Sequence, residues 1–392
     1  MFTRQFEGVF DRFLKSFPAI ILTGARQVGK TSFIKEHCKT HHYVLLEDLD
    51  LRAQVLQDPK SFLDRYPPPV IFDEFQNVPD LTSYLQSRID AKRDEKGQYI
   101  LTGSQNFLMM EQVTQSLAGR VGLITLYPLT VKEISASIDL EWHQEDTLSQ
   151  ILFRGFFPEL WRDQNILPTD WHRSYLNTYL ERDIRSLAQV ADLLSFERFV
   201  RLCAIRTGQI LNVSDLARDA NISPSTAQRW LNLLVQTYQV HLVEPFYENI
   251  SSRIRKSPKM YFMDVGLACY LMGFRDPSLI AGSPQFGPLF ETLVVTNLIK
   301  HWTSQGEMPP HYYLKTPSLE IDLMVQNQTL WDVYEIKSTR TITQDTLKQL
   351  EKAKKELGKK ANQFYLMVPL ENPYPFLGMN IQPWHLPPEE KA

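Results

Sequence analysis

Apolar positions in the first third of the chain fall in short continuous runs separated by amphipathic or loop segments. The runs include AIILTG (19–24), PVIFDE (69–74) and QYILTGS (98–104). Such runs, alternating with helical patterns, are typical of a parallel sheet, because helices then cover both faces of each strand. We therefore predict an α/β fold with a parallel sheet for residues 1–128.

The period of the apolar positions changes after residue 128. Residues 129–192 have helical spacing without clear strands, which predicts a small helical lid. Residues 193–275 contain helices, a short turn and two strand-like pieces, HLVEPFYEN (241–249) and KMYFMDVG (259–266). Residues 276–392 predict a small α/β domain in the order helix, three strands, helix, strand. We expect the proline-rich tail after Pro369 to be irregular.

Composition narrows the class of protein without naming a function. The 392 residues exceed one typical domain, and 43% hydrophobic with 22% charged residues is typical of a soluble globular chain. Because no apolar run approaches the roughly eighteen residues of a membrane span, we expect a cytoplasmic protein without membrane contact. The three cysteines lie too far apart to indicate a zinc site. The net charge of -3 gives no global attraction to nucleic acid, so any such contact requires local basic patches such as 253–259 or 348–360.

The segment GARQVGKTS (24–32) carries the clearest chemistry. Its spacing fits G-x-x-x-x-G-K-[ST], and it lies between a predicted strand and a predicted helix as that pattern requires. Glycines let backbone N–H groups surround phosphates, the lysine reaches the β and γ oxygens, and the hydroxyl binds Mg²⁺. We expect contacts to ATP from Gly24, Ala25, Arg26, Gln27, Val28, Gly29, Lys30, Thr31 and Ser32.

Polar residues at the ends of later strands predict the rest of an ATPase site. Asp73 and Glu74 end an apolar run, where Asp73 would hold Mg²⁺ through water and Glu74 would polarise the attacking water. Thr102 or Ser104 is a candidate γ-phosphate sensor, the alternative being a simple turn. Arg120 precedes another predicted strand, where it would either reach the γ-phosphate of a neighbouring subunit or form a surface salt bridge.

Residues 212–240 predict a helix-turn-helix. A first helix ends before a turn at Asn221 and Ile222, Ser223 is a good N-cap, and Pro224 suits the first position of a second helix. Burial of Ala227, Trp230, Leu231 and Leu234 would leave a polar face outward, which contacts bases in helix-turn-helix proteins. The predicted DNA contacts are Ser225, Thr226, Gln228, Arg229 and Asn232 on this helix, and Arg253, Arg255, Lys256 and Lys259 around a basic tip between two strands. The alternative is a unit that packs subunits together.

The segment LEIDLMVQNQTLWDVYEIKS (319–338) places acids and a lysine on adjacent predicted strands. The period of two puts Glu320 and Asp322 on one face, and Glu335 and Lys337 on one face of the next strand. A hairpin would bring Asp322 and Glu335 together, and two carboxylates with a lysine suit metal-dependent phosphodiester hydrolysis. An open sheet face with ordinary charges is the competing interpretation.

The motifs resemble, in order along the chain, those of the prokaryotic AAA-type ATPases that carry a C-terminal domain of unknown function. The resemblance rests on LTGARQVGKTS (22–32), IFDEFQNVPDL (71–81), ILTGSQN (100–106), LAGR (117–120), YLERDI (179–184), KSPKMYFMDVGL (256–267) and the EIDL and YEIKS segments. It implies an AAA+ core, a winged helix over 193–275 and a restriction-endonuclease-like module over 276–392. The last segment is also similar to PD-(D/E)xK nucleases, which implies that Glu291 completes a metal site with Asp322 and Glu335.

Two functions follow as hypotheses. In the first, a ring-forming or otherwise oligomeric ATPase binds DNA, branched DNA included. It couples ATP turnover to translocation or remodelling of that DNA, with metal-dependent cleavage as a further activity. In the second, a nucleotide-switched regulatory ATPase holds a protein partner, and its nuclease-like domain is not catalytic. Both require ATP and Mg²⁺.

Overall fold

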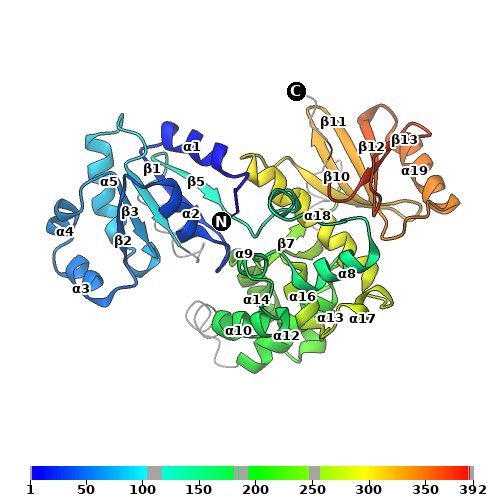
Figure 1. Ribbon diagram of the computed structural model, residues 1–392, viewed down its shortest axis with the longest axis horizontal. Coiled ribbons are helices and arrows are strands. Elements are labelled where there is room, and N and C mark those ends of the chain that lie inside the picture. The colour runs from blue at the N-terminus through cyan, green and yellow to red at the C-terminus, as the bar shows by residue number, and fades with distance from the viewer. Residues whose placement is uncertain are drawn as a thin grey trace.

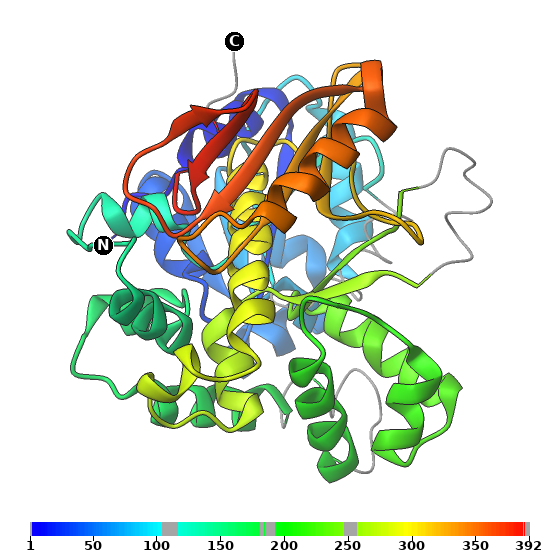
Figure 2. The same ribbon diagram turned by 90° about the vertical axis from the view of Figure 1, so that its right-hand side faces the viewer.

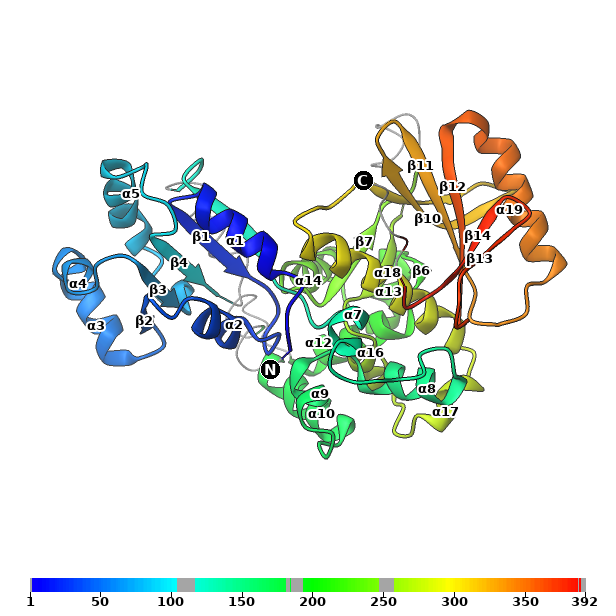
Figure 3. The ribbon, with the colours of Figure 1, turned by 45° about the horizontal axis from the view of Figure 1, so that its top comes forward.

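A parallel-sheet lobe and a mixed-sheet domain lie at opposite ends of the molecule, with a mainly helical unit between them (Figure 1). The computed structural model describes residues 2–103, 117–180, 184, 193–246, 257–386 and 388. Turning the molecule shows the same order of lobe, middle unit and C-terminal sheet (Figure 3). No helix in these described ranges is long and apolar enough to cross a membrane.

The N-terminal lobe has the predicted α/β fold. Its parallel sheet has the order β2-β3-β4-β1-β5. The strands are β1 (Ala19–Thr23), β2 (His42–Leu45), β3 (Val70–Asp73), β4 (Tyr99–Thr102) and β5 (Val121–Thr125). The helices are α1 (Glu7–Ser16), α2 (Lys30–His37), α3 (Leu49–Gln57), α4 (Pro59–Arg65), η1 (Phe75–Asn77) and α5 (Leu81–Ala91).

Continuous apolar runs form the central strands because both faces of the sheet are covered. Successive residues of a strand point to opposite faces. Ile20 and Leu22 accordingly pack with Phe10 of α1, whereas Ile21 packs in a separate core with Leu85 of α5. All five residues of β1 are buried, which explains why this strand shows no apolar-polar alternation in the sequence.

The middle unit joins the predicted lid to the helix-turn-helix in one core. It contains α7 (Val131–Ser135), α8 (Glu145–Arg154), α9 (Pro158–Arg162), α10 (Pro168–Tyr179), α12 (Leu193–Ile205), β6 (Gln209–Ile210), α13 (Val213–Ala220), α14 (Pro224–Gln236), β7 (Val240–Val243), β8 (Lys259–Phe262), α16 (Val265–Met272) and α17 (Ser278–Ala281). Helices α8 and α10 pack against α16. The helices expected to form a separate lid therefore belong to the core of the middle unit.

Close contact between Gly155 and Asp264 fixes the packing of α8 against α16. Asp264 caps α16 by accepting from the Leu267 N–H at 2.9 Å and also accepts from the Phe156 N–H at 2.6 Å. A Cβ added at Gly155 would lie 2.3 Å from the Asp264 carboxylate, and this glycine has a φ of +75°. Any side chain here would therefore separate α8 from α16.

The helix-turn-helix geometry confirms the local prediction. Asn221 has a φ of 57° and ends α13, and the Ser223 hydroxyl accepts from the Thr226 N–H at 3.1 Å at the start of α14. Pro224 occupies the first turn of α14, where its missing N–H costs nothing. The antiparallel strands β7 and β8, with β6, form a small sheet beside these helices.

The C-terminal domain packs a mixed sheet around one long helix. Helix α18 (Phe286–Ser304) is buried along most of its length and runs through the centre of the view in Figure 2. The sheet has the order β13-β14-β12-β11-β10-β9. Its strands are β9 (His311–Lys315), β10 (Glu320–Asn327), β11 (Leu330–Ile336), β12 (Ala361–Val368), β13 (Tyr374–Phe376) and β14 (Met379–Pro383), with α19 (Gln344–Leu357) and η3 (Gly358–Lys360) between β11 and β12.

The tail after Pro369 is not irregular, so that prediction was wrong. Strand β14 pairs in parallel with β12, and β13 turns back along β14. Proline is tolerated here because Pro375 lies on β13, at the end of the sheet order, and Pro383 ends β14. Tail residues thus complete the sheet.

Candidate functional site

The phosphate-type loop lies between β1 and α2, as the sequence predicts. Gly24 and Gly29 have φ values of +140° and +95°, and Gln27 has a φ of 60°. A Cβ at Gly24 would lie 2.1 Å from the Leu126 carbonyl oxygen, so close approach to the chain after β5 requires glycine. The loop therefore has three residues with positive φ, a backbone that suits the binding of an anion by successive N–H groups.

The Lys30 ammonium is held inside this loop. It donates to the carbonyl oxygens of Gly24 and Ala25 at 2.8 Å each, and only 8% of the residue is exposed. In a phosphate-binding loop the lysine donates to phosphate oxygens, and here the two carbonyl oxygens accept from it instead. Lysine is thus already positioned at the start of α2, whose N-terminus favours anions.

The Asp73 carboxylate joins three strands at the carboxyl edge of the sheet. Its Oδ2 accepts from the Thr31 hydroxyl at 2.8 Å and from the Tyr43 hydroxyl at 2.6 Å. Its Oδ1 accepts from the Thr102 hydroxyl and from the Glu74 N–H, the latter at 3.1 Å. The structure therefore brings together Thr31 and Asp73, the pair that the sequence assigns to Mg²⁺. Thr102 is a hydrogen-bond donor to Asp73.

Glu74 follows Asp73 in a left-handed conformation with a φ of 57°. Its carboxylate accepts from the Gln76 side chain, and its carbonyl accepts from the Asn77 side chain at 3.0 Å. A non-glycine residue rarely adopts this backbone unless its surroundings hold it there. The turn thus holds Glu74 directly after Asp73 at the sheet edge, with its carboxylate bound to Gln76.

Two residues of this site have no signal in the sequence. Tyr43, on β2, contacts Asp73, and the pKa of its hydroxyl is raised by burial and by that carboxylate. Arg4 precedes α1 and donates to the Val28 carbonyl in the loop at 2.9 Å, to the Tyr127 carbonyl at 2.7 Å and to Glu133 at 3.0 Å. Neither belongs to a motif, because each reaches the site from a distant part of the chain.

Arg120 forms an ion pair on the surface of the lobe. Its Nε lies 2.6 Å from one Asp90 carboxylate oxygen and its terminal nitrogen 2.9 Å from the other. This is the salt-bridge alternative of the two expected for Arg120, and a contact across subunits remains a prediction. Ser104, the other candidate of this region, lies outside the described residues.

A buried hydroxyl directly after α14 contacts the nucleotide lobe. Tyr238 follows α14 with a φ of 59° and donates to the Thr23 hydroxyl at 2.7 Å. Thr23 is the last residue of β1, directly before the loop, and also contacts the Thr125 hydroxyl at 3.1 Å. The end of α14 therefore touches the strand that supports the phosphate-type loop.

The outward face of α14 matches its prediction. Ser225, Gln228, Arg229 and Asn232 are exposed and Thr226 is half-buried, whereas Ala227, Trp230, Leu231 and Leu234 are buried. Arg253, Arg255 and Lys256 lie outside the described residues. Lys259 is different: only 3% of it is exposed, so its expected contact with phosphates at a basic tip was wrong.

Lys259 instead enters the acidic cluster of the C-terminal domain. Its Nζ lies 3.0 Å from Glu291 Oε1, 3.3 Å from Asp322 Oδ1 and 3.6 Å from Glu320 Oε1. Burial opposes the charged form, but Asp322 and Glu291 outweigh burial and raise the pKa of Lys259. The ammonium is therefore charged and fills the space between these carboxylates.

The other members of the cluster come from α18, β10 and β11. Asp322 Oδ2 accepts from the Ile336 N–H at 2.9 Å, and Lys337 contacts Glu335. Burial, together with Asp322, raises the pKa of Glu291 to about 7 and that of Glu335 to about 8. Within the described residues no group of three His, Cys, Asp or Glu has metal-binding geometry. The structure thus gathers the predicted residues, with Lys259 between Glu291 and Asp322 and Lys337 against Glu335, and the metal site itself stays a prediction.

Comparison with known proteins bears directly on the N-terminal lobe. Residues 16–135 match the family described as an AAA domain. The chain carries an AAA-type ATPase domain. Residues 286–387 match a domain of unknown function (DUF4143), as the resemblance implied, and residues 145–278 match another (DUF8612). The span of the latter includes the helix-turn-helix and the expected lid from α8 onward, but not α7.

Similar proteins span most of the chain. An uncharacterized protein of Mycobacterium tuberculosis is 29% identical over 332 residues, 84% of this chain and 72% of that protein. One of Methanocaldococcus jannaschii is 23% identical over 367 residues, 86% of this chain and 79% of that protein. Among solved structures, the Walker-type ATPase of Pyrococcus abyssi has a TM-score of 0.45 at 15% identity, covering 69% of this chain and 96% of that chain. RuvB of Thermotoga maritima has a TM-score of 0.29 at 16% identity, covering 60% and 87%.

Proposed function

We propose that this AAA domain hydrolyses ATP and that the middle unit uses the turnover to act on DNA. The observation that carries the ATPase assignment is the 2.8 Å hydrogen bond from the Thr31 hydroxyl, at the end of the loop, to the Asp73 carboxylate. A hydroxyl and a carboxylate oxygen at adjoining positions are the oxygen ligands that Mg²⁺ prefers. When bound, Mg²⁺ would neutralise charge on the phosphates.

The remaining residues supply binding and proton transfer. Loop N–H groups from Gly24 to Ser32 would hold the phosphates, and Lys30 would exchange its two carbonyl partners for β and γ oxygens. Glu74, held by Gln76 at the same edge, would accept the proton of the attacking water. Thr102 orients Asp73, which supports a positioning role for this threonine.

The DNA-binding part of the proposal rests on α14 and its support. The exposed residues Gln228, Arg229 and Asn232 lie on one face of a well-capped helix, which suits insertion into a major groove. Tyr238 connects the end of that helix to β1, so nucleotide-dependent movement of the loop has a direct route to α14. We include a homo-oligomer, with Arg120 leaving Asp90 to reach a neighbouring nucleotide, in this proposal.

The alternative function has its own supporting observation. A regulatory ATPase with a non-catalytic nuclease-like domain is favoured by Lys259, which pairs with the carboxylates that cleavage would need. In that case the C-terminal modules would bind a protein partner and nucleotide turnover would time its release.

Steady-state ATP hydrolysis with and without DNA tests the proposal. Lys30→Ala should abolish turnover, and Lys39→Ala, which removes an exposed lysine of the same lobe, should not. Turnover retained by Lys30→Ala would overturn the loop assignment.

Duplex, single-stranded and four-way-junction DNA are then compared at moderate salt. We expect at least one of them to stimulate hydrolysis, Arg229→Ala to lose that stimulation, and Arg218→Ala on the neighbouring helix to keep it. Indifference of the wild-type rate to every nucleic acid would overturn the DNA part and support the regulatory alternative.

A further inference from the structure

One buried lysine connects the middle unit to the acidic cluster of the C-terminal domain. Lys259 is the first residue of β8 and pairs with Val243 of β7, so its backbone belongs to the middle unit. Its side chain crosses to Glu291 on α18 and to Asp322 on β10. The contact therefore joins segments that lie 32 and 63 residues apart in the sequence.

The Lys259 ammonium is surrounded by carboxylates that have further partners, and by one aromatic ring. Glu291 also accepts from the Tyr261 hydroxyl at 2.6 Å, and Glu320 is shared with Lys315 at 2.8 Å. The ring of Tyr313 lies 5.8 Å from the Lys259 ammonium. Each carboxylate is thus held by fixed partners, with Lys259 at the point where Glu291 and Asp322 converge.

A lysine in this position takes the place of a metal ion. A divalent cation held by carboxylates sits between their oxygens, at about 2.0–2.6 Å from each for Mg²⁺ or Ca²⁺. The Lys259 nitrogen lies between the same oxygens at 3.0 and 3.3 Å, which are hydrogen-bond distances. An ammonium and a divalent cation cannot occupy this space together.

We propose that Lys259 is a tethered cation that occupies the position of a divalent cation between Glu291 and Asp322. The acidic cluster therefore binds no divalent metal at this position while the Lys259 side chain is present. This inference does not depend on ATP hydrolysis or on DNA binding.

Mn²⁺ binding without nucleotide, followed by electron paramagnetic resonance of free Mn²⁺, tests the proposal. Lys259→Met should gain one Mn²⁺ per chain over wild type, with at least about tenfold tighter binding at the new site. Lys315→Met, which removes an exposed lysine that pairs with Glu320, should bind Mn²⁺ as wild type does. Adding Asp322→Asn to Lys259→Met should remove the gained site.

Equal Mn²⁺ binding by wild type and Lys259→Met overturns the proposal, whether both bind the extra ion or neither does. Removal of Lys259 leaves buried carboxylates unbalanced, so the single variant can fail to fold. In that event the double variant Lys259→Met with Glu320→Gln is compared with Glu320→Gln alone, because Glu320 also lies 3.6 Å from Lys259 and both chains retain Glu291 and Asp322. A gain of Mn²⁺ only in the double variant supports the block, and no gain refutes it.

Discussion

Replacing Tyr238 with phenylalanine removes the hydroxyl that joins α14 to the nucleotide lobe and leaves the ring in place. That hydroxyl is buried and donates to Thr23 at 2.7 Å, while the ring packs edge-on to Tyr127 with centroids 5.9 Å apart. A neutral hydrogen bond of this kind contributes about 1 kcal/mol net. The coupling free energy that this hydrogen bond can carry from the nucleotide site to α14 is therefore at most about 1 kcal/mol. That corresponds to about a fivefold change in the conformational equilibrium of α14.

Amide hydrogen exchange of residues 224–238, with and without ATP, measures this transfer. Glu74→Gln is included throughout to slow hydrolysis. We expect ATP to change exchange in α14 in the parent protein, and Tyr238→Phe to reduce that change while ATP still binds.

The control is Tyr179→Phe, which removes a buried hydroxyl contact of 2.7 Å to Thr237 within the middle unit. Both variants should lose about 1 kcal/mol of unfolding free energy. Only Tyr238→Phe should weaken the response of α14 to ATP. An equal response in Tyr238→Phe and Tyr179→Phe would refute a role for the Thr23 contact in coupling.

Three further predictions concern charged side chains. Arg4→Ala should lower the free energy of unfolding, measured in urea, by about 3 kcal/mol, because the buried Glu133 carboxylate loses its cationic partner. Adding Glu133→Gln to Arg4→Ala should recover part of that loss, and additive losses would contradict the pairing. Arg120→Ala should slow hydrolysis by about 10³-fold if the arginine acts across subunits, whereas Asp90→Ala should not, and equal rates would leave only their ion pair. Burial lowers the pKa of Lys300 to about 8, so the unfolded chain binds more protons between that pH and the ordinary value of 10.5. Folding stability relative to Lys300→Met should therefore rise by up to about 3 kcal/mol as pH increases from 8 to 10.5, and a fall would contradict the sign.

The sequence predicts the parts of the site that depend on neighbouring residues. The loop, the acids after β3 and the caps of α14 are local patterns, and each occurs where it was expected. Arg4 and Tyr43 could not be predicted in this way, since their partners are 24 to 129 residues away. Their contacts depend on how the strands are ordered and how α1 packs.

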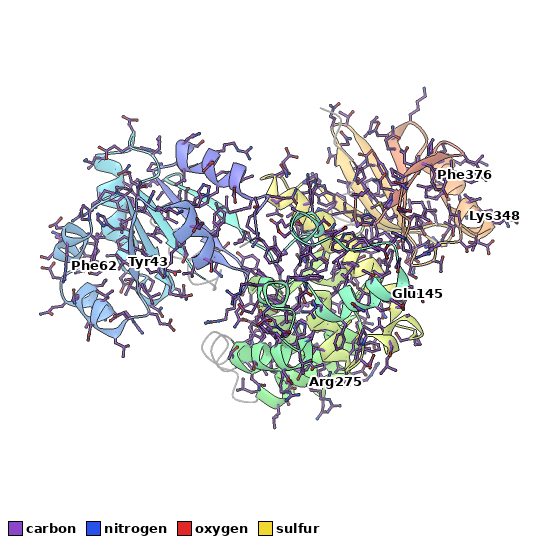
Figure 4. The ribbon with its side chains drawn as sticks, viewed as in Figure 1. Tyr43, Phe62, Glu145, Arg275, Lys348 and Phe376 are labelled. Carbon is purple, nitrogen blue, oxygen red and sulfur yellow. The ribbon has the colours of Figure 1, made fainter. Side chains whose placement is uncertain are left out.

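Lys259 shows how a charge pattern can mislead. In the sequence it adjoins other basic residues and therefore resembles part of an exposed basic tip. All four residues of β8 are buried, however, so this lysine points into the protein. The other basic segment, 348–360, does lie on the surface along α19, and Lys348 is at the end of the molecule opposite Tyr43 (Figure 4). Charge alone therefore cannot separate a buried counter-ion from a binding patch.

The contacts that Tyr238 and Lys259 make outside the middle unit differ in how easily they break. Exposing the neutral pair of Tyr238 and Thr23 to water costs about 1 kcal/mol, because both hydroxyls regain hydrogen bonds there. Withdrawing Lys259 leaves the partly buried Glu291 and the buried Asp322 without their cation, which costs about 3–5 kcal/mol unless another cation replaces it. Nucleotide binding alone is therefore expected to move α14 before it releases Lys259. Displacement of Lys259 then requires a second contribution, such as a divalent ion that takes its place between Glu291 and Asp322.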